Sequence, residues 1–561
     1  MLVSACSSIL GETPVDTSPD DSSDTSATGG DEDPEPPTTP DGGCVRFTGD
    51  HSSAIDTGSL ATDALSLSGE TFLCASDVVV VAEGDLNEVS AAAQLAAALS
   101  GPLLFPEPRL AAELGRLKPE RVHLVGGPEV NVPDGARTID HDASAAAALA
   151  LEELGVTETV DIPAAPDSST VVEAVLAIEA GDRVATPAVT QSSTTMAAAD
   201  VTLDVGVIVS GVAAAVDTSS VWLVDAAKPQ TLLLAASFGH ILGSSVLAID
   251  GGDILGYPEV GDALGGREGD DTRFVGGTPE GAEWELAVLA NGQQLPGGGF
   301  HILPEDQQRR YVAYYGHPET DGLGVLGEQG PAETLEKMQG FVEEYGADDA
   351  QVVPTFEMIA SVASAGPTDD GDYSYEWPIE TFQAWVDFAG ENDMYVVLDL
   401  QSGRDDFLSQ AVQYEELLKL PYVGLALDPE WRLEDDQVHL EQIGSVGGAE
   451  VNQVIDWLGD LVRDNGLPQK MLIVHQFRLS MITEREDLKQ RPEIQLVIQM
   501  DGEGGEGEAS KDATYRTISE GTEDAHWAWG WKNFFDEDVP GPPSPASVIT
   551  KEPPLVYVSY Q

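Results

Sequence analysis

Acidic side chains recur at the ends of apolar runs in the C-terminal half of this sequence. Asp428 and Glu430 directly follow the run Val423–Leu427, and Trp431 comes next. The four acids that this pattern selects as catalytic candidates are Glu357, Asp399, Asp428 and Glu430. Two carboxyl groups can cleave a glycosidic bond, because one donates a proton while the other serves as base or nucleophile. We predict Glu430 as the acid and Asp428 or Asp399 as its partner.

Aromatic and polar residues stand at the other run ends and suit contacts with a sugar. Aromatic faces stack on sugar rings, while amide, imidazole and carboxylate groups bond to hydroxyls. The substrate-binding candidates are Tyr315, His317, Trp431, His475, Gln476, Asp501, Trp529 and Trp531. Asp399 lies inside an apolar run, where an unpaired carboxylate would be costly, so it must face a partner or a wet cavity.

Several of these residues also have a purely structural interpretation. A chain with 98 Asp and Glu residues places some of them at strand ends by chance. Asp501 precedes a Gly- and Glu-rich loop and suits a helix cap. Trp529 and Trp531 alternate as core residues do, and His475 equally suits a buried core position. Both interpretations of these four residues stay open, whereas the place of Asp428 and Glu430 beside Trp431 favours function.

The elements that must position these side chains repeat along residues 300–561. The expected strands are Tyr311–Tyr315, Gln351–Phe356, Tyr395–Leu400, Val423–Leu427, Met471–Val474, Gln495–Met500, Trp527–Trp531 and Leu555–Ser559. The clearest helices between them are Ala332–Tyr345, Ile379–Ala389, Asp406–Leu418 and Ala449–Asn465. Eight strands alternating with helices predict a (β/α)8 barrel, which carries its chemistry at the C-terminal strand ends. Weak helices after the sixth strand keep a seven-stranded or distorted barrel as the rival.

A second α/β region is predicted over residues 65–295. Short apolar strands such as Val78–Ala82 and Arg121–Gly127 alternate with Ala-rich helices such as Asn87–Leu99. Short loops in strand–helix–strand order predict right-handed crossovers and a parallel sheet. The pattern recurs from Ser220 to Glu280, and residues 140–215 read as a degenerate middle copy.

Residues 101–127 contain "GPLLF" and "AAELGRLKPERVHLVGG", and on these motifs the region resembles the bacterial cell-wall-binding repeat type 2 family. The resemblance implies Rossmann-like units that hold surface proteins on anionic wall polymers. The local cluster of basic residues that an anionic polymer would need is small: Arg109, Arg116, Lys118 and Arg121.

Residues 300–561 resemble the glycoside-hydrolase-type TIM barrels. The Asp-x-Glu formed by Asp428 and Glu430 is similar to the acidic motif of the family 25 lysozyme-like enzymes. The motifs "LGVLGEQGP", "LDLQSGR", "LALDPEWRL", "HQFRLSMI" and "WGWKNFFDED" also resemble uncharacterised domains of actinobacterial surface lipoproteins. These resemblances imply a barrel that acts on a glycan or binds it.

The first 64 residues read as a tether. Val3–Cys6 is similar to a bacterial lipobox, which makes Cys6 the lipidation candidate, although the apolar segment that should precede it is absent. Residues 11–43 are acidic, rich in Ser, Thr and Pro and without Lys or Arg, a composition that cannot fold. Cys44 and Cys74 can pair as a disulfide in an oxidising compartment. The alternative is a ragged, disordered start with a chance lipobox.

Charge excludes one class of partner. The chain of 561 residues has 98 acidic and 26 basic residues, a formal net charge of −72, which argues against nucleic acid. No zinc-like spacing of cysteines and no dinucleotide fingerprint occur, so we expect neither metal nor cofactor. No apolar stretch reaches the roughly 18 residues of a membrane span.

Together these patterns predict an extracytoplasmic, lipid-anchored envelope protein. Its α/β region would dock on the cell wall, and its barrel would act on a wall or extracellular glycan. Two alternatives stay open. One is a non-catalytic scaffold or glycan-binding protein, and the other is a metal-assisted hydrolase that would use His317, His475, Asp399 and Asp501.

Overall fold

A computed structural model describes most of the chain. The described residues are 44–45, 54–154, 158–162, 183–187, 208–209, 220–225, 227–249, 253–264, 272–279, 281–304 and 307–561. Cys6, most of the predicted tether and most of the predicted middle copy lie outside them. Among the described residues, no helix has both the length and the apolar character needed to cross a bilayer.

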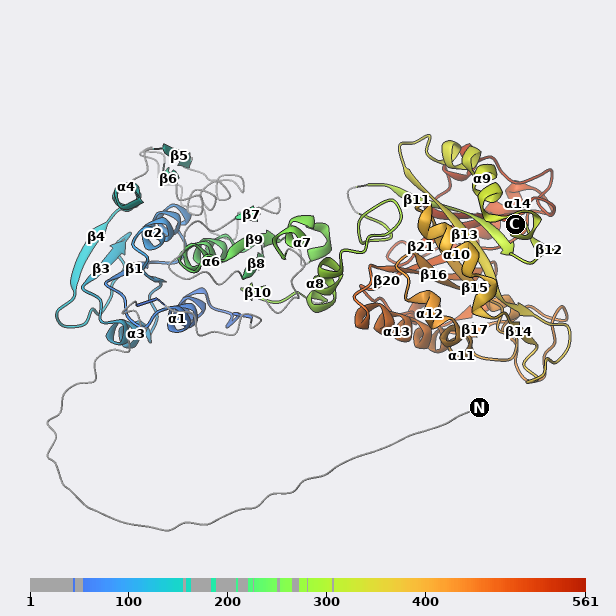
Figure 1. Cartoon of the computed structure of the whole chain (residues 1–561), viewed down its shortest axis with the longest axis horizontal. Helices are drawn as coiled ribbons and strands as arrows, with labels where there is room; N and C mark the ends of the chain where they lie inside the picture. Colours follow the sequence, from blue (N-terminus) through green and yellow to red (C-terminus); the bar gives the residue numbers. More distant parts are fainter. Residues whose placement is uncertain are drawn as a thin grey trace, which may run out of the picture.

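The first group of elements forms a parallel four-stranded sheet with strand order β2-β1-β3-β4 (Figure 1). Its elements are α1 (Leu60–Thr71), β1 (Asp77–Val81), α2 (Leu86–Ala98), β2 (Leu103–Leu104), α3 (Leu110–Leu117), β3 (Arg121–Val125), β4 (Arg137–His141) and α4 (Ala143–Leu154). Every residue of β1 is buried, as its unbroken run of valines predicts. The strand–helix alternation expected over this stretch is therefore present.

A second sheet has the order β10-β8-β9-β7, with only β7 antiparallel. Its elements are β7 (Ile208–Val209), β8 (Val221–Asp225), α6 (Pro229–Leu242), β9 (Ser245–Ile249), η2 (Ile254–Gly256), α7 (Pro258–Leu264), β10 (Thr272–Val275) and α8 (Ala282–Asn291). A separate strand pair joins β5 (Glu158–Ile162) to β6 (Arg183–Pro187). Helices α2 and α6 pack together, so one apolar core links both sheets.

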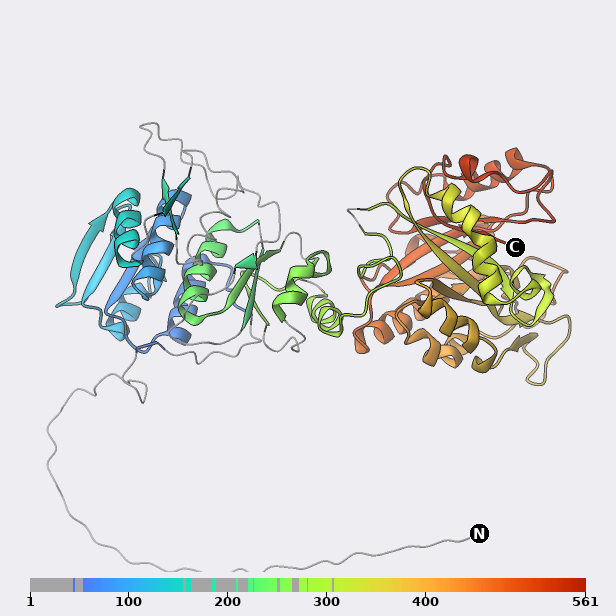
Figure 2. The ribbon, with the colours of Figure 1, turned by 45° about the horizontal axis from the view of Figure 1, so that its top comes forward.

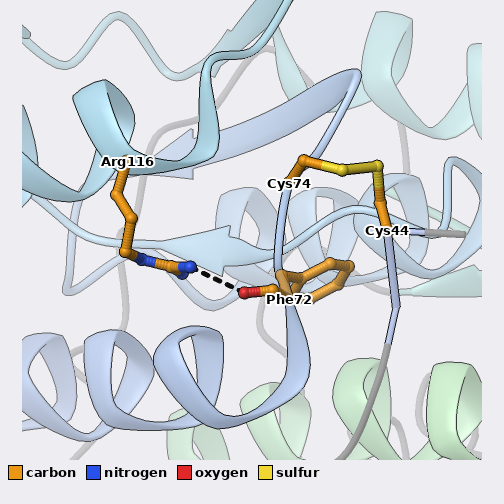
Figure 3. Close-up of a disulfide and its surroundings, with 4 residues drawn as sticks. All are labelled: Cys44, Phe72, Cys74 and Arg116. Atoms are coloured by element: carbon orange, nitrogen blue, oxygen red, sulfur yellow. Dashed lines mark hydrogen bonds between the residues drawn. A yellow bond between two sulfur atoms is a disulfide. The ribbon is translucent and has the colours of Figure 1, made fainter. Parts of the chain in front are cut away.

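A disulfide fastens the start of this region. Cys44 and Cys74 are joined, with their Cα atoms 4.8 Å apart (Figure 3). Beside the bridge, Arg116 Nη1 donates a hydrogen bond of 2.7 Å to the Phe72 carbonyl. The bridge thus ties the segment that leaves the predicted tether to the chain entering β1.

Replacing both cysteines, as Cys44→Ser with Cys74→Ser, should lower the free energy of unfolding of this region by about 3 kcal/mol. The reason is that the bridge spans a sequence separation of 30 residues, and its loss restores entropy to the unfolded chain. Thermal and urea unfolding without reductant would measure the loss. The wild-type protein in dithiothreitol is the control, and equal stability of wild type and double variant would contradict the prediction.

The second group of elements is a closed barrel of eight parallel strands. The barrel strands are β11 (Arg309–His317), β13 (Gln351–Ala363), β15 (Tyr395–Leu400), β16 (Val423–Leu427), β18 (Lys470–Gln476), β20 (Ile494–Met500), β21 (Ala528–Asn533) and β22 (Leu555–Tyr560). Each pairs with the next, and β22 returns to β11, which also pairs with β13. The predicted (β/α)8 barrel is confirmed, and the seven-stranded rival is wrong.

Helices cover the outside of the barrel (Figures 1 and 2). They are α9 (Pro331–Tyr345), α10 (Gln383–Glu391), α11 (Phe407–Ala411), α12 (Glu415–Leu418), α13 (Gly448–Asp464), α14 (Glu508–Ser519) and α15 (Pro545–Val548). The hairpin strands β12 (Thr320–Gly324) and β14 (Ser374–Glu376) extend β11 and β13 beyond the barrel. The short strands β17 (Val446–Gly447) and β19 (Ile482–Thr483) pair separately. Short 3-10 turns complete the connections: η4 (Leu326–Glu328), η5 (Ile379–Thr381), η6 (Val412–Tyr414), η7 (Pro429–Trp431), η8 (Leu479–Met481) and η9 (Arg485–Asp487).

Alternation along each strand separates two cores. Tyr311 and Ala313 of β11 belong to the cluster inside the barrel, whereas Val312 and Tyr314 belong to the layer between strands and helices. The inner cluster is apolar over the lower part of the strands. This packing leaves the C-terminal strand ends as the place where polar side chains can point inward.

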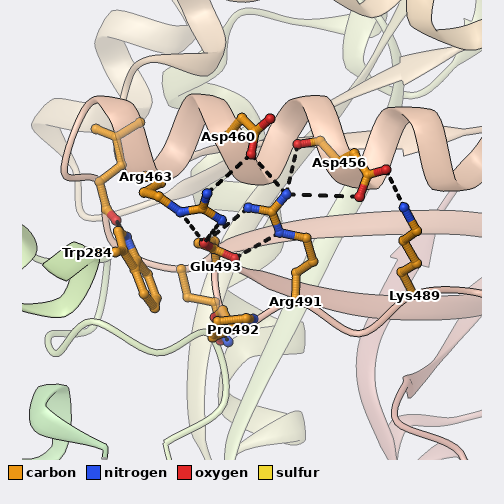
Figure 4. A network of polar contacts seen from close by, with 10 residues as sticks. Trp284, Asp456, Asp460, Arg463, Lys489, Arg491, Pro492 and Glu493 are labelled. Carbon is orange, nitrogen blue, oxygen red and sulfur yellow. Dashed lines mark hydrogen bonds and ion pairs between the residues drawn. The ribbon is translucent and has the colours of Figure 1, made fainter. Parts of the chain in front are cut away.

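Helix α8 connects the second sheet to the barrel. Trp284 is 2% exposed, and its Nε1 donates a 2.9 Å hydrogen bond to the Leu467 carbonyl. Next to it, Glu493 is held by Arg463 and Arg491 in a chain of ion pairs that continues to Asp460 (Figure 4). Trp284 thus contributes buried apolar area and a hydrogen bond to the contact, while the ion pairs beside it join residues of the barrel region to one another.

Glu493→Gln should lower the free energy of unfolding at neutral pH by about 1.5–3 kcal/mol, the range for hydrogen bonds to charged groups. Burial alone would raise the pKa of Glu493, but hydrogen bonds from Arg491 and Arg463 lower it. The stabilisation is thus present above the ordinary glutamate pKa and is lost as pH falls through the lowered value. Urea unfolding at neutral and acidic pH tests this, with the exposed Glu486→Gln as control. A difference that persists at low pH would contradict it.

Candidate active site

A cavity of about 650 Å³ opens at the C-terminal ends of the barrel strands. The predicted site residues that line it are Tyr315, Asp428, Glu430, Trp431 and Asp501, and Gln401 lies beside them. Lys532 also lines it, together with the apolar side chains of Phe477 and Phe534. The cavity is therefore acidic, with aromatic walls, at the end of the barrel where this fold carries its chemistry.

The predicted acids Glu357 and Asp399 lie directly beneath this cavity. Both are fully buried, on the inward face of β13 and β15. Tyr557 donates a hydrogen bond of 3.1 Å to Glu357 Oε2. Tyr315 donates one of 2.8 Å to Asp399 Oδ2, and Gln401 in turn donates to the Tyr315 hydroxyl at 3.3 Å. The expectation that Asp399 must face a polar partner thus agrees with its hydrogen bond to Tyr315.

His475 lies among the acidic residues beneath the cavity. Its Nε2 lies 3.0 Å from Glu357 Oε1, and its Nδ1 lies 3.1 Å from Asp501 Oδ2 and 3.8 Å from Asp428 Oδ2. Burial alone would lower the pKa of His475, but the carboxylates of Asp501, Asp428 and Glu357 hold it well above 6.5. The three carboxylates thus stabilise the charged form of the imidazole, which is a different role from that of a neutral core histidine.

Lys532 supplies the second buried cation. Its Nζ lies 3.3 Å from Asp501 Oδ1 and 3.6 Å from the centre of the Tyr315 ring. Burial would raise the pKa of Asp501, yet Lys532 and His475 lower it below the ordinary value. Asp501 is thus an ionised carboxylate held between two cations, rather than the helix cap that was its structural interpretation.

Asp428 and Glu430 stand together on the cavity wall. Oxygen atoms of Asp428, Glu430 and Asp501 all lie within 4.8 Å of one another. Asp428 is 1% exposed, whereas Glu430 is half-buried at the wall. Burial, with the nearby charges of Asp428 and Asp501, raises the pKa of Glu430 to about 9. Glu430 is therefore a protonated acid at neutral pH.

Asp399 is the second carboxyl group with a displaced pKa. Burial raises it, and the charges of Asp428 and Glu357 add to the rise, while His475 opposes it, which leaves the pKa of Asp399 at about 7. A proton donor and a carboxylate that titrates near neutrality thus occur in one site. Groups of a pair pushed to different pKa values are the usual basis of acid–base catalysis.

Four predicted site residues lie away from the cavity. Trp529 and Trp531 pack against Tyr515 of α14 in the layer between barrel and helix, with ring centres 5.6 and 5.8 Å apart. They take the core position that was their alternative interpretation. His317 packs on Trp377 at 4.3 Å and accepts a hydrogen bond from the Glu319 amide. Gln476 is fully buried, and its amide oxygen accepts a hydrogen bond from Arg485.

The sequence reasoning missed Lys532 as a site residue. In β21, Gly530 and Lys532 alternate with the two tryptophans, so one set must face inward and the other outward. The Trp-Gly-Trp-Lys pattern thus indicated that either the tryptophans or Lys532 face the barrel interior, and the prediction placed the tryptophans there. Gln401 and Arg478, which also line the cavity, follow strands β15 and β18 in the same way as the acids that were selected.

Two groups of side chains in this site have a spacing that could hold a metal ion. They are Asp399 with Asp428 and His475, and Asp428 with Glu430 and Asp501. In both, a protonated His475 or the ammonium of Lys532 already neutralises part of the charge. His317 lies apart from them, so the residue set of the metal-assisted alternative does not assemble. A third acidic group, Asp370, Asp372 and Glu376, lies on the loop before and into β14.

The fold and the cavity define the class: a (β/α)8 barrel with an acidic, aromatic-walled cavity at its C-terminal strand ends. No family model and no curated protein matches the chain. Among solved structures, the chain is similar to Cwp6 from Clostridium difficile, with 11% sequence identity and a TM-score of 0.30. The match covers 62% of each chain, less than two thirds of Cwp6. At these values the likeness carries no argument about activity.

Proposed function

We propose that the barrel hydrolyses glycosidic bonds of a cell-envelope glycan. The observation that carries the proposal is the place of Glu430, half-buried on the cavity wall, with a carboxyl oxygen within 4.8 Å of one of Asp428. Trp431 and Tyr315 supply aromatic faces in the same cavity. A proton donor, a nearby carboxylate and aromatic walls are what glycoside hydrolysis requires.

In this proposal Glu430 protonates the oxygen of the leaving sugar, and Asp428 or Asp399 is the carboxylate partner. Retaining glycosidases hold their two carboxyl groups roughly 5–5.5 Å apart, and inverting ones about 6.5–9.5 Å apart. The short spacing of Asp428 and Glu430 supports a retaining mechanism. Asp428 would then form a glycosyl ester, and Glu430, now deprotonated, would activate the water that hydrolyses it.

The remaining regions complete the proposal as an envelope lipoprotein. Lipid on Cys6 would anchor the chain, and residues 65–295 would dock it on the wall as cell-wall-binding repeats. The Cys44–Cys74 disulfide supports an oxidising, extracytoplasmic location. Basic side chains remain few there, so docking would depend on shape and hydrogen bonding more than on charge.

A panel of wall and extracellular glycans tests the proposal with the full chain. Wild-type protein should release reducing ends from at least one glycan, and the product anomer should keep the substrate's configuration. No turnover of any glycan would overturn the enzyme proposal. Retention of a glycan without turnover, weakened by Trp431→Ala, would instead identify a glycan-binding scaffold.

A further inference from the structure

The cavity and the layer beneath it contain more acidic groups than basic groups. Six carboxyl groups line it or lie directly beneath it: Glu357, Asp399, Asp428, Glu430, Asp501 and Glu503. The basic groups among the described residues at this site are Lys532, Arg478 and His475. Glu430 is protonated and Asp399 titrates near pH 7, but the other four carboxyl groups still outnumber the three basic groups, so the site keeps a small excess of negative charge.

Asp428 also has an unused acceptor. It lies on the cavity wall and is 1% exposed, and its Oδ1 has no hydrogen-bond partner among the described residues. Asp399 Oδ1, below it, is likewise buried without a partner in the described part of the chain. A buried acceptor left without a donor costs about 1–3 kcal/mol, and more when it is charged. A donor brought by the ligand would remove this cost.

We infer that the cavity selects a cationic sugar: the protonated amine of an N-unsubstituted amino sugar binds against Asp428. The ammonium donates to Asp428 Oδ1 and offsets the excess charge of the neighbouring acids. An anionic glycan is repelled by the same acids and by the chain's net charge of −72. The choice of a sugar rests on the proposed function, whereas the preference for a cation rests on the charges and the unused oxygen alone.

Calorimetric titration of the full chain with short chitosan and chitin oligomers tests the inference. The two ligands share their sugar ring and linkage and differ in whether the amine is free or acetylated. In a Glu430→Gln background, which prevents turnover, at about pH 6, chitosan oligomers should bind at least about tenfold more tightly. Added salt should reduce that preference, because it screens the charge interaction.

Asp428→Asn in the same background should abolish the preference, because it weakens the binding of chitosan oligomers more than that of chitin oligomers. Glu336→Gln is the matched control, since it removes one exposed acid of α9 that does not line the cavity. If Asp428→Asn fails to fold by circular dichroism, Glu503→Gln takes its place, at an exposed acid that lines the cavity, and should reduce the preference. Equal binding of both oligomers would overturn the inference.

Mg²⁺ and Ca²⁺ alone form the other arm of the test. Binding of either ion that depends on Asp428, without a preference for chitosan, would identify a metal-binding site and overturn the inference. The two proposals fail separately. A preference for chitosan with no turnover of any glycan would support the cation site and contradict the hydrolase proposal. Turnover of a glycan without the preference would support the hydrolase and contradict the cation site.

Discussion

Glu430→Gln should reduce kcat for glycan hydrolysis by about 10²–10⁴-fold, the contribution of a positioned general acid. Glutamine keeps the shape of the side chain but cannot supply the proton to the leaving oxygen. Because the change removes a group that acts in the transition state, kcat should fall with little change in KM. Initial rates on the glycan identified by the panel provide the measurement.

Glu434→Gln is the matched control for this variant. Glu434 is exposed on the same connection after β16 and does not line the cavity, so its activity should equal that of the wild type. A Glu430→Gln protein that is correctly folded and within tenfold of the wild-type rate would exclude Glu430 as the acid.

The pH profile follows from the same geometry. Glu430 must be protonated to act, and its pKa is about 9, so kcat/KM should fall as pH rises through about 9. The partner must be ionised. If the partner is Asp399, whose pKa is about 7, activity should also fall as pH drops through about 7. Activity that persists well below pH 7 would exclude Asp399 as the partner.

The eight barrel strands were readable from sequence because each is a short apolar run between turn or helix signals. Tyr395–Leu400 and Val423–Leu427 have the predicted bounds unchanged. A strand in a (β/α)8 barrel is buried on both faces, so its composition marks the strand without marking which side faces inward. This is why the acids at the strand ends were found, while the orientation of other residues was not.

Orientation accounts for the errors in the predicted site. Trp529 and Lys532 lie in one strand and both are buried, so hydrophobicity gave no reason to place the lysine inside and the tryptophan outside. His317 lies two residues beyond Tyr315, but β11 continues into a hairpin with β12 whose register shifts at Gly316 and His317. Only the folded hairpin shows that His317 leaves the cavity.

Helix α14 was missed for a related reason. Its buried side chains include Lys511, Tyr515 and Ile518, which have a helical spacing. A lysine in this series weakens the apolar pattern from which a helix is read. Lys511 is buried because its Nζ makes hydrogen bonds of 2.9 and 2.7 Å with Asp538. That partner lies 27 residues away, so the pair cannot be inferred from local sequence.

Lys532→Met should lower the free energy of unfolding of the barrel by about 3–5 kcal/mol, the cost of leaving one partner of a buried ion pair alone. Lys532 is 3% exposed and lies 3.3 Å from Asp501. Methionine fills a similar volume but leaves Asp501 and its acidic neighbours with less positive charge. Urea unfolding followed by tryptophan fluorescence measures the change.

Two further variants separate the ion pair from a simple packing effect. Lys337→Met, at an exposed lysine with a surface ion pair to Glu328, should cost less than about 1 kcal/mol. Adding Asp501→Asn to Lys532→Met should recover part of the lost stability, because the double variant no longer buries the unpaired carboxylate. Losses that simply add in the double variant would show that Lys532 stabilises the barrel by packing, and that the charge balance of the site does not depend on it.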